Sequence, residues 1–131
     1  MIRQIIPVFV TADIPATITY YTDKLGFELL GTWSPGKDEP PVYAILARDQ
    51  QVIHFRCAED VAATLAAARS AKYTEEILDA YIQIEDADAL YAEFAAKGVE
   101  FARGLGDMPW KSREFVVKDG DGRLLAFGAS L

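Results

Sequence analysis

The chain has 131 residues, and 13 Lys and Arg against 20 Asp and Glu give it a net charge of −7. This acidic balance argues against nucleic acid or an anionic membrane surface as a partner, and it mildly favours a cationic ligand. No apolar run reaches the roughly 18 residues of a membrane span, no export signal is evident, and one cysteine cannot form an internal disulfide, so a cytoplasmic protein is expected.

The first half of the chain is predicted to form one strand, one helix and three further strands. After a strand at 4–11, Asp13 fits a helix N-cap, Pro15 falls in the first turn and Gly26 ends the helix. These residue types favour those positions because of their hydrogen-bonding and backbone preferences. Alternation and turn-forming residues then predict strands at 27–33, 42–48 and 51–57.

The second half of the chain repeats this order. A strand at 80–85 precedes a helix that starts at Asp86 or Asp88 and ends at Gly98. The letters GFE follow the first helix and the letters GVE follow the second, so the chain reads as two copies of one unit. The strands expected after the second helix are 99–103, 114–118 and 123–128.

Two connecting segments complete the pattern. The letters DGDG at 119–122 predict a tight hairpin, because glycine tolerates the positive φ of such turns. A calcium loop would need a glutamate at its twelfth position, and this sequence has none there. The alanine-rich stretch 58–78 predicts a short helix plus a linker. We therefore expect a single domain with module one at about 1–58, a linker at about 59–78 and module two at about 79–131.

Side chains on a strand alternate between its two faces, so their parity predicts which ones are buried. On the strand 51–57, His54 and Arg56 share one face, and Cys57 lies on the other, apolar face. The apolar faces should pack beneath the helices, which makes Cys57 a small buried residue and leaves His54 on a face that meets solvent or lines a cleft. The polar face of the strand that opens the second half carries Asp79, Tyr81 and Gln83.

The chain resembles the glyoxalase, bleomycin-resistance and extradiol-dioxygenase superfamily, also called vicinal oxygen chelate proteins, in the phrases YYTDKLGFEL, IEDADALYAEFAAKGVEF and FVVKDGDGRLLAF. The resemblance covers nearly the whole chain. It implies an α+β fold of two βαβββ modules that form an incomplete, U-shaped mixed sheet around a cavity, with the helices on the outer face. It also implies a homodimer.

Metal-dependent members of this superfamily place His, Gln or Glu ligands on the first and last strand of each module. The corresponding positions in this sequence are Ile6, His54, Asp79 and Ala126. Two protein donors make a weak site unless water or substrate completes it. No cofactor is therefore expected, and His54 and Asp79 are only weak candidates for a divalent metal. His54 could instead line a cavity, bind a ligand or pair with Asp79.

The bleomycin-resistance branch is the nearer likeness, because it has a proline in the first strand, as Pro7 is here, and no metal ligands. Its members bind a bulky drug in a cleft between two subunits without chemistry, and tryptophans from loops flank the cleft. The resemblance thus implies a protein that sequesters a small organic ligand, cationic by charge complementarity, and has no catalytic residue. The expected ligand-binding residues are Trp33, Tyr43, His54, Arg56, Asp79, Tyr81, Gln83, Trp110 and Phe115.

Other interpretations stay open at this point. The chain could be a metal-dependent glyoxalase-like lyase, isomerase or dioxygenase that uses His54 and Asp79, with substrate or a partner chain completing the metal shell. It could also be a structural or regulatory partner that has lost its ligand. Trp33 and Trp110 could anchor loops rather than contact a ligand, and Arg56 and Arg113 could hold an anionic group or lie in solvent.

Overall fold

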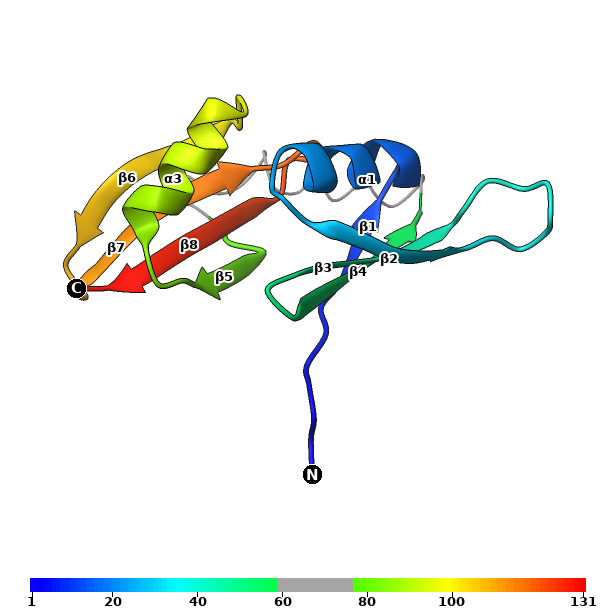
Figure 1. The fold of residues 1–131 in the computed structure, drawn as a ribbon, viewed down its shortest axis with the longest axis horizontal. Coiled ribbons are helices and arrows are strands. Elements are labelled where there is room, and N and C mark those ends of the chain that lie inside the picture. The colour runs from blue at the N-terminus through cyan, green and yellow to red at the C-terminus, as the bar shows by residue number, and fades with distance from the viewer. Residues whose placement is uncertain (59–76) are drawn as a thin grey trace. The chain divides into compact units, whose positions relative to one another are not determined.

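The computed structural model describes residues 1–58 and 77–131. The chain forms two compact units, Met1–Ala67 and Ala68–Leu131, and each contains one described helix and one four-stranded mixed sheet (Figure 1). The α+β class and the two βαβββ modules are thereby confirmed. The helix and linker predicted at 58–78 lie almost entirely outside the described residues.

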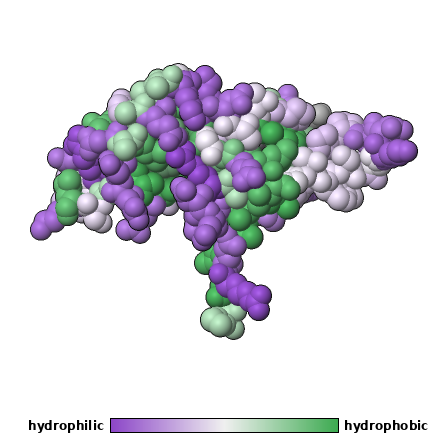
Figure 2. Space-filling model, in the orientation of Figure 1, coloured by the Kyte–Doolittle hydropathy of each residue, from purple (hydrophilic) through white to green (hydrophobic). Residues whose placement is uncertain are grey.

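Module one has its last strand in the interior of the sheet. The strand order is β1-β4-β3-β2, in which β1 runs parallel to β4 and the other neighbours are antiparallel. The first strand is shorter than predicted, and the exposed residues before it extend away from the sheet as a segment with both apolar and polar side chains (Figures 1 and 2). The elements are β1 (Val8–Thr11), α1 (Ile14–Asp23), β2 (Glu28–Trp33), β3 (Tyr43–Arg48) and β4 (Gln51–Cys57).

Module two repeats this topology with the order β5-β8-β7-β6. Its second and third strands along the chain differ from the prediction, because β6 continues through Gly104 and Gly106, and β7 already starts at Ser112. Register shifts on both sides of Arg103 accommodate the glycine-rich stretch as an irregular strand. The elements are β5 (Ala80–Gln83), α3 (Ala87–Ala96), β6 (Phe101–Met108), β7 (Ser112–Lys118) and β8 (Leu124–Ser130).

Both helices start and end with the same devices. Asp13 Oδ1 accepts a hydrogen bond from Ala16 N, and Asp86 Oδ1 accepts one from Ala89 N, each at 3.0 Å. These bonds satisfy amide groups that the first turn leaves without a partner. The caps are confirmed, and the second helix starts after Asp86 rather than after the alternative aspartate. Glycines in the left-handed conformation follow the two helices, Gly26 at φ 73° and Gly98 at φ 75°.

No helix in the described part of the chain is long and apolar enough to cross a membrane.

Each module builds its core between its helix and one face of its sheet. In module one, Tyr21 of α1 packs edge-on against Phe55 of β4 with ring centroids 4.8 Å apart. In module two, Phe94 of α3 lies 5.3 Å from Phe127, which stacks on Phe115 at 5.2 Å. The apolar strand faces therefore pack beneath the helices, as their parity predicted.

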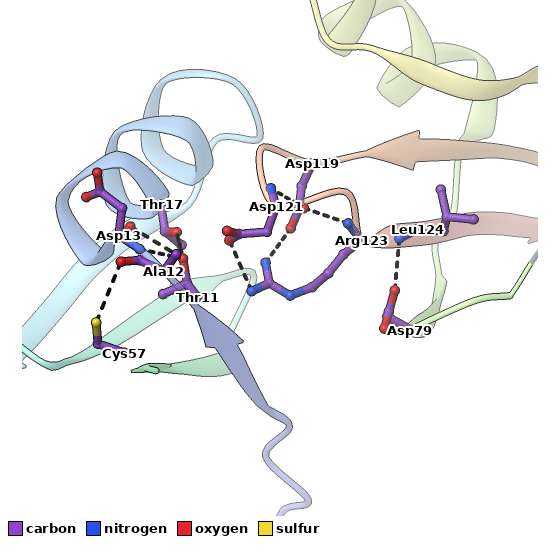
Figure 3. A network of polar contacts seen from close by, with 10 residues as sticks. All are labelled: Thr11, Ala12, Asp13, Thr17, Cys57, Asp79, Asp119, Asp121, Arg123 and Leu124. Atoms are coloured by element: carbon purple, nitrogen blue, oxygen red, sulfur yellow. Dashed lines mark hydrogen bonds and ion pairs between the residues drawn. The ribbon is translucent and has the colours of Figure 1, made fainter. Parts of the chain in front are cut away.

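Cys57 departs from this prediction in its degree of burial. It lies on the helix-facing side of β4, but at the last residue of the strand, where it is only half-buried. Its Sγ lies 3.7 Å from the carbonyl oxygen of Ala12 (Figure 3). The end of a strand is covered less completely than its middle, which explains why parity alone overestimated the burial of this thiol.

The turn between β3 and β4 requires left-handed backbone at two residues that are not glycine. Asp49 has φ 50° and Gln50 has φ 68°, the combination found in two-residue type I′ turns. We expect Gln50→Gly to raise the free energy of unfolding by about 1 kcal/mol, because the left-handed conformation costs roughly that much in an L-residue. Urea denaturation measures the change. Gln51→Gly, one residue later in β4, should instead destabilise the protein, and a loss in both variants would contradict the argument.

The hairpin between β7 and β8 contains a buried ion pair. Asp119 Oδ1 accepts hydrogen bonds from the backbone N–H groups of Asp121 at 3.0 Å and Arg123 at 2.9 Å (Figure 3). Arg123 Nη1 lies 2.6 Å from Asp119 Oδ2, and Arg123 Nη2 lies 3.1 Å from Asp121 Oδ2. The tight hairpin at DGDG is confirmed, and its aspartates bind backbone N–H groups and the guanidinium group of Arg123.

Candidate ligand-binding site

The face of the second sheet that points away from α3 carries a cluster of polar and aromatic side chains. Tyr81 on β5 pairs with Ala126 on β8, and the next position of β8, two residues on, is Gly128, which pairs with Glu114 on β7. Residues that pair across strands project from the same face. Tyr81 and Glu114 therefore share this face, with β8 between their strands.

Glu114 is the centre of the cluster. Its Oε2 accepts hydrogen bonds from Tyr81 Oη at 2.7 Å and from Trp110 Nε1 at 2.9 Å. Its Oε1 lies 3.4 Å from Arg103 Nη2. Glu114 is only 1% exposed, and a buried carboxylate persists only when hydrogen bonds and a countercharge offset its desolvation. This arrangement supplies both.

The same contacts determine the protonation of Glu114. Burial by itself would raise the pKa of this carboxyl group, but hydrogen bonds from Trp110, Tyr81, Ser112 and Arg103 outweigh burial, and the net shift of the pKa is downward. Glu114 is accordingly an anion at neutral pH, and its neighbours act as donors.

Tyr81 shows the complementary effect. A hydrogen bond with Ser112 lowers its pKa, but the hydrogen bond to Glu114, burial and the carboxylate charge raise it, and the net shift is upward. The phenol therefore keeps its proton and donates a hydrogen bond to Glu114. This environment disfavours the phenolate form of Tyr81, which a general base would need.

Gly128 allows Tyr81 to cross β8. A Cβ atom at this position would lie 2.8 Å from Tyr81 Cζ, nearer still to Tyr81 Oη, and 2.9 Å from Ser112 Oγ. Any side chain at this position would displace the phenol from Glu114. Gly128 is thus needed to leave space for Tyr81, and not because its backbone conformation demands a glycine.

Trp110 reaches the cluster from the turn between β6 and β7. Lys111 N donates to Met108 O at 3.0 Å, and Lys111 has φ 63°, as in three-residue hairpin loops that end in a left-handed residue. The indole N–H is bound to Glu114, yet Trp110 is 63% exposed. The turn therefore presents a large aromatic surface to solvent while one edge of the ring is anchored.

The face of the first sheet that points away from α1 carries a second group of the predicted residues. Trp33 pairs with Tyr43, and Tyr43 pairs with Arg56, so the three share this face with His54. Tyr43 Oη lies 2.7 Å from His54 Nδ1. Trp33 is the last residue of β2, as in the strand predicted at 27–33. Because β2 ends at this residue, the side chain of Trp33 is 60% exposed.

Two predicted site residues lie elsewhere. Asp79 precedes β5, and its Oδ2 accepts a hydrogen bond from Leu124 N at 3.0 Å (Figure 3). In the second sheet, Ala126 pairs with Tyr81 and not with Asp79. In the first sheet, His54 pairs with Val8 and not with Ile6. Phe115 is fully buried on the opposite face of β7, beneath α3, because strand parity turns it away from Glu114.

Within residues 1–58 and 77–131, no three His, Cys, Asp or Glu side chains gather as a metal site requires. His54 lies on β4 of module one, and Asp79 directly precedes β5 of module two. His54 has Tyr43 as its neighbour, and Asp79 binds a backbone amide.

Arg113 does not offer its charge to an anionic ligand. It lies on the α3 side of β7, where its Nε is 3.1 Å from Asp88 Oδ2 and its Nη1 is 2.8 Å from Asp107 Oδ1. Hydrogen bonds to these two carboxylates raise its pKa. Arg56, in contrast, lies exposed on the mixed face of the first sheet.

The sequence reasoning missed the three polar members of the cluster. Ser112 and Glu114 alternate with Arg113 and Phe115, so their shared face could have been read from strand parity. The predicted strand began only at Glu114, which hid that alternation. Arg103 follows a register shift, and no periodic pattern could have assigned it to this face.

Comparison with known proteins gives one family. The chain matches the Glyoxalase/Bleomycin resistance protein/Dioxygenase superfamily over residues 4–127. Bleomycin resistance proteins of Geobacillus stearothermophilus and Staphylococcus aureus are each 27% identical to it over 133 aligned positions, which cover 95% of this chain and 94% of theirs.

Solved structures agree with this family. The bleomycin-binding protein of Streptomyces verticillus, solved with copper(II)-bleomycin, is 25% identical, with a TM-score of 0.69 and coverage of 100% of both chains. TioX from Micromonospora sp. ML1 shares the fold at 18% identity, with a TM-score of 0.74 and coverage of 98% of this chain and 99% of its own. The chain therefore belongs to the glyoxalase/bleomycin resistance protein/dioxygenase superfamily, as its sequence phrases predicted.

Proposed function

We propose that this protein binds and sequesters a small organic molecule and carries out no chemistry on it. The observation that carries the proposal is the cluster on module two, where Glu114 anchors the exposed rings of Trp110 and Tyr81. Aromatic surfaces fixed by a few polar contacts are typical of sites for organic ligands. Relatives named for bleomycin resistance and bleomycin binding support the same class of ligand.

The chemistry of the side chains supports binding rather than catalysis. Tyr81 keeps its proton and donates a hydrogen bond to Glu114, and Glu114 Oε2 also accepts a hydrogen bond from Trp110. The enzyme alternative needs His54 and Asp79 as metal ligands, and Asp79 already accepts a hydrogen bond from a backbone amide. Stoichiometric nickel, zinc, manganese or iron in the purified protein that is lost in His54→Ala would revive that alternative.

The face of the first sheet that points away from α1 offers further groups of the kind that such a ligand would contact. On module one, Trp33 and Tyr43 offer aromatic surface, and Arg56 offers hydrogen-bond donors beside His54. The net charge of −7 favours the approach of a cationic molecule. These features fit a ligand with flat rings, polar groups and a positive charge, which describes glycopeptide drugs of the bleomycin class.

We expect the purified protein to bind bleomycin, and Trp110→Ala to weaken binding by roughly 5- to 150-fold, because an exposed aromatic anchor contributes roughly 1–3 kcal/mol. Isothermal titration calorimetry with metal-free and copper-loaded bleomycin measures both, and sedimentation of the same samples tests the homodimer that the family resemblance implies. Arg113→Ala, on the other face of β7, is the control and should bind like the parent. If neither bleomycin nor other planar cationic compounds bind the parent, the proposal fails.

A further inference from the structure

We infer that Glu114 is the positioning residue of this face: it orients Trp110 and Tyr81 for the ligand and does not itself serve as the ligand's countercharge. The inference rests on the proposed function and assigns a role that the binding proposal leaves open. Its basis is a contrast in exposure, since Glu114 is 1% exposed whereas Tyr81 is 51% and Trp110 63% exposed. The anchor is buried and the rings that it holds are accessible.

The hydrogen bonds explain how one side chain orients two rings. Both ring donors converge on the same oxygen, Glu114 Oε2, at 2.7 Å from Tyr81 Oη and 2.9 Å from Trp110 Nε1. A hydrogen bond to an ionised acceptor is stronger than one between neutral groups. Exposed rings would otherwise sample several rotamers, and ordering them in advance lowers the entropic cost of binding.

The same contacts keep the charge of Glu114 from the ligand. Arg103 Nη2 lies 3.4 Å from its Oε1 and already provides a countercharge. The ion pair leaves the cluster close to neutral, and the burial of the carboxylate denies a ligand cation direct contact. The charge of Glu114 therefore does not create a preference for cationic ligands. The part of the ligand that binds at this face contacts the rings of Trp110 and Tyr81.

Gly128 provides a way to separate the two rings experimentally. A Cβ atom at this position would overlap Tyr81 and also crowd Ser112 Oγ, whereas Trp110 is not among its nearest neighbours. Gly128→Ala should thus move Tyr81 away from Glu114 while the Trp110 hydrogen bond remains. Because the displaced atoms are the phenol end of Tyr81 and the hydroxyl of Ser112, and none of them is backbone, the protein should still fold.

The first experiment reads the orientation of Trp110 without any ligand. The chain has two tryptophans, so a Trp33→Phe background isolates Trp110. In this background, Glu114→Ala should abolish most of the near-ultraviolet circular dichroism of Trp110 and increase its quenching by acrylamide, whereas Glu114→Gln, which keeps one amide oxygen as acceptor, should retain the parent signals. In a Trp110→Phe background, the similarly exposed Trp33 should not respond to Glu114→Ala.

The second experiment reads Tyr81. Its pKa is raised by the contact with Glu114, so Gly128→Ala should lower that pKa toward the ordinary value for tyrosine, as observed by NMR of ring-labelled tyrosine. This readout decides the question if Glu114→Ala does not fold. A folded Glu114→Ala protein with unchanged Trp110 signals, or a Gly128→Ala protein with an unchanged Tyr81 pKa, would overturn the inference.

Bleomycin titration distinguishes this inference from the proposed function. We expect Glu114→Ala to weaken bleomycin binding about tenfold, the effect of losing roughly one charge-assisted hydrogen bond, with Glu114→Gln close to the parent. If the Trp110 and Tyr81 signals change as expected but bleomycin binds none of the proteins, the ligand class is wrong and the positioning role stands. If bleomycin binds all variants equally, the positioning role is wrong and the binding function stands.

Discussion

Replacing Asp119 with alanine is expected to lower the free energy of unfolding by about 3–5 kcal/mol, because it leaves a buried guanidinium without its main countercharge. The side chains of Asp119 and Arg123 are 1% and 2% exposed, and Asp119 Oδ2 lies 2.6 Å from Arg123 Nη1. The other carboxylate oxygen accepts two backbone hydrogen bonds that close the hairpin, so the turn loses its acceptor as well. Urea denaturation followed by circular dichroism at neutral pH measures the loss.

Asp121→Ala is the matched control for this prediction. It changes the charge equally in the same hairpin, but Asp121 is 23% exposed and lies 3.1 Å from Arg123 Nη2, so we expect a loss of about 1 kcal/mol or less. Asp119→Asn keeps an oxygen for the backbone and should fall between the two. Equal losses for the two alanine variants would show that the buried pair does not stabilise the hairpin.

Glu114→Ala is expected to cost about 2 kcal/mol, since it removes a buried acceptor shared by several donors. The loss should be smaller than for Asp119, because Trp110 and Tyr81 are exposed enough for their donors to bind water instead. Thermal and urea denaturation of the variant test this order. A larger loss for Glu114→Ala than for Asp119→Ala would contradict the comparison of burial.

The effect of Glu114 should also depend on pH in a defined direction. Its pKa is lowered in the folded protein, so its charge stabilises the fold above the unfolded-state pKa of about 4.3. This contribution is lost as the pH falls through the lower, folded-state pKa. The stability difference between the parent and Glu114→Gln should therefore shrink below about pH 4. Asp107→Asn, an exposed carboxylate on the other face, should show a much smaller difference at neutral pH.

Most of the fold could be predicted because its signals are local. A capping aspartate, a glycine after the helix and a glycine-rich hairpin each act through backbone hydrogen bonds or φ within a few residues. The bounds of β6 could not be predicted in this way. Gly104 and Gly106 are typical of loops, and only pairing with β7 keeps them in a strand.

The candidate site was less predictable because it depends on pairing between distant strands. Parity placed Tyr81 and Gln83 on the face that points away from the helix. The hydrogen-bond partner of Tyr81 lies two strands away, however, and is a glutamate, a residue type that is seldom buried. Phe115 was assigned by residue type, and its parity turns it into the core. The site residues that the sequence missed are those defined by register.

The position of β8 between β5 and β7 has a consequence for synthesis of the chain. A nascent chain that ends before Leu124 contains β5 and the β6–β7 hairpin but lacks β8. The hydrogen bonds through which β8 joins β5 to β7 cannot form yet. Module two can complete its sheet only after residues 124–130 have left the ribosome, because both neighbours of β8 pair with it. Module one, whose last strand ends at Cys57, reaches that stage more than sixty residues earlier.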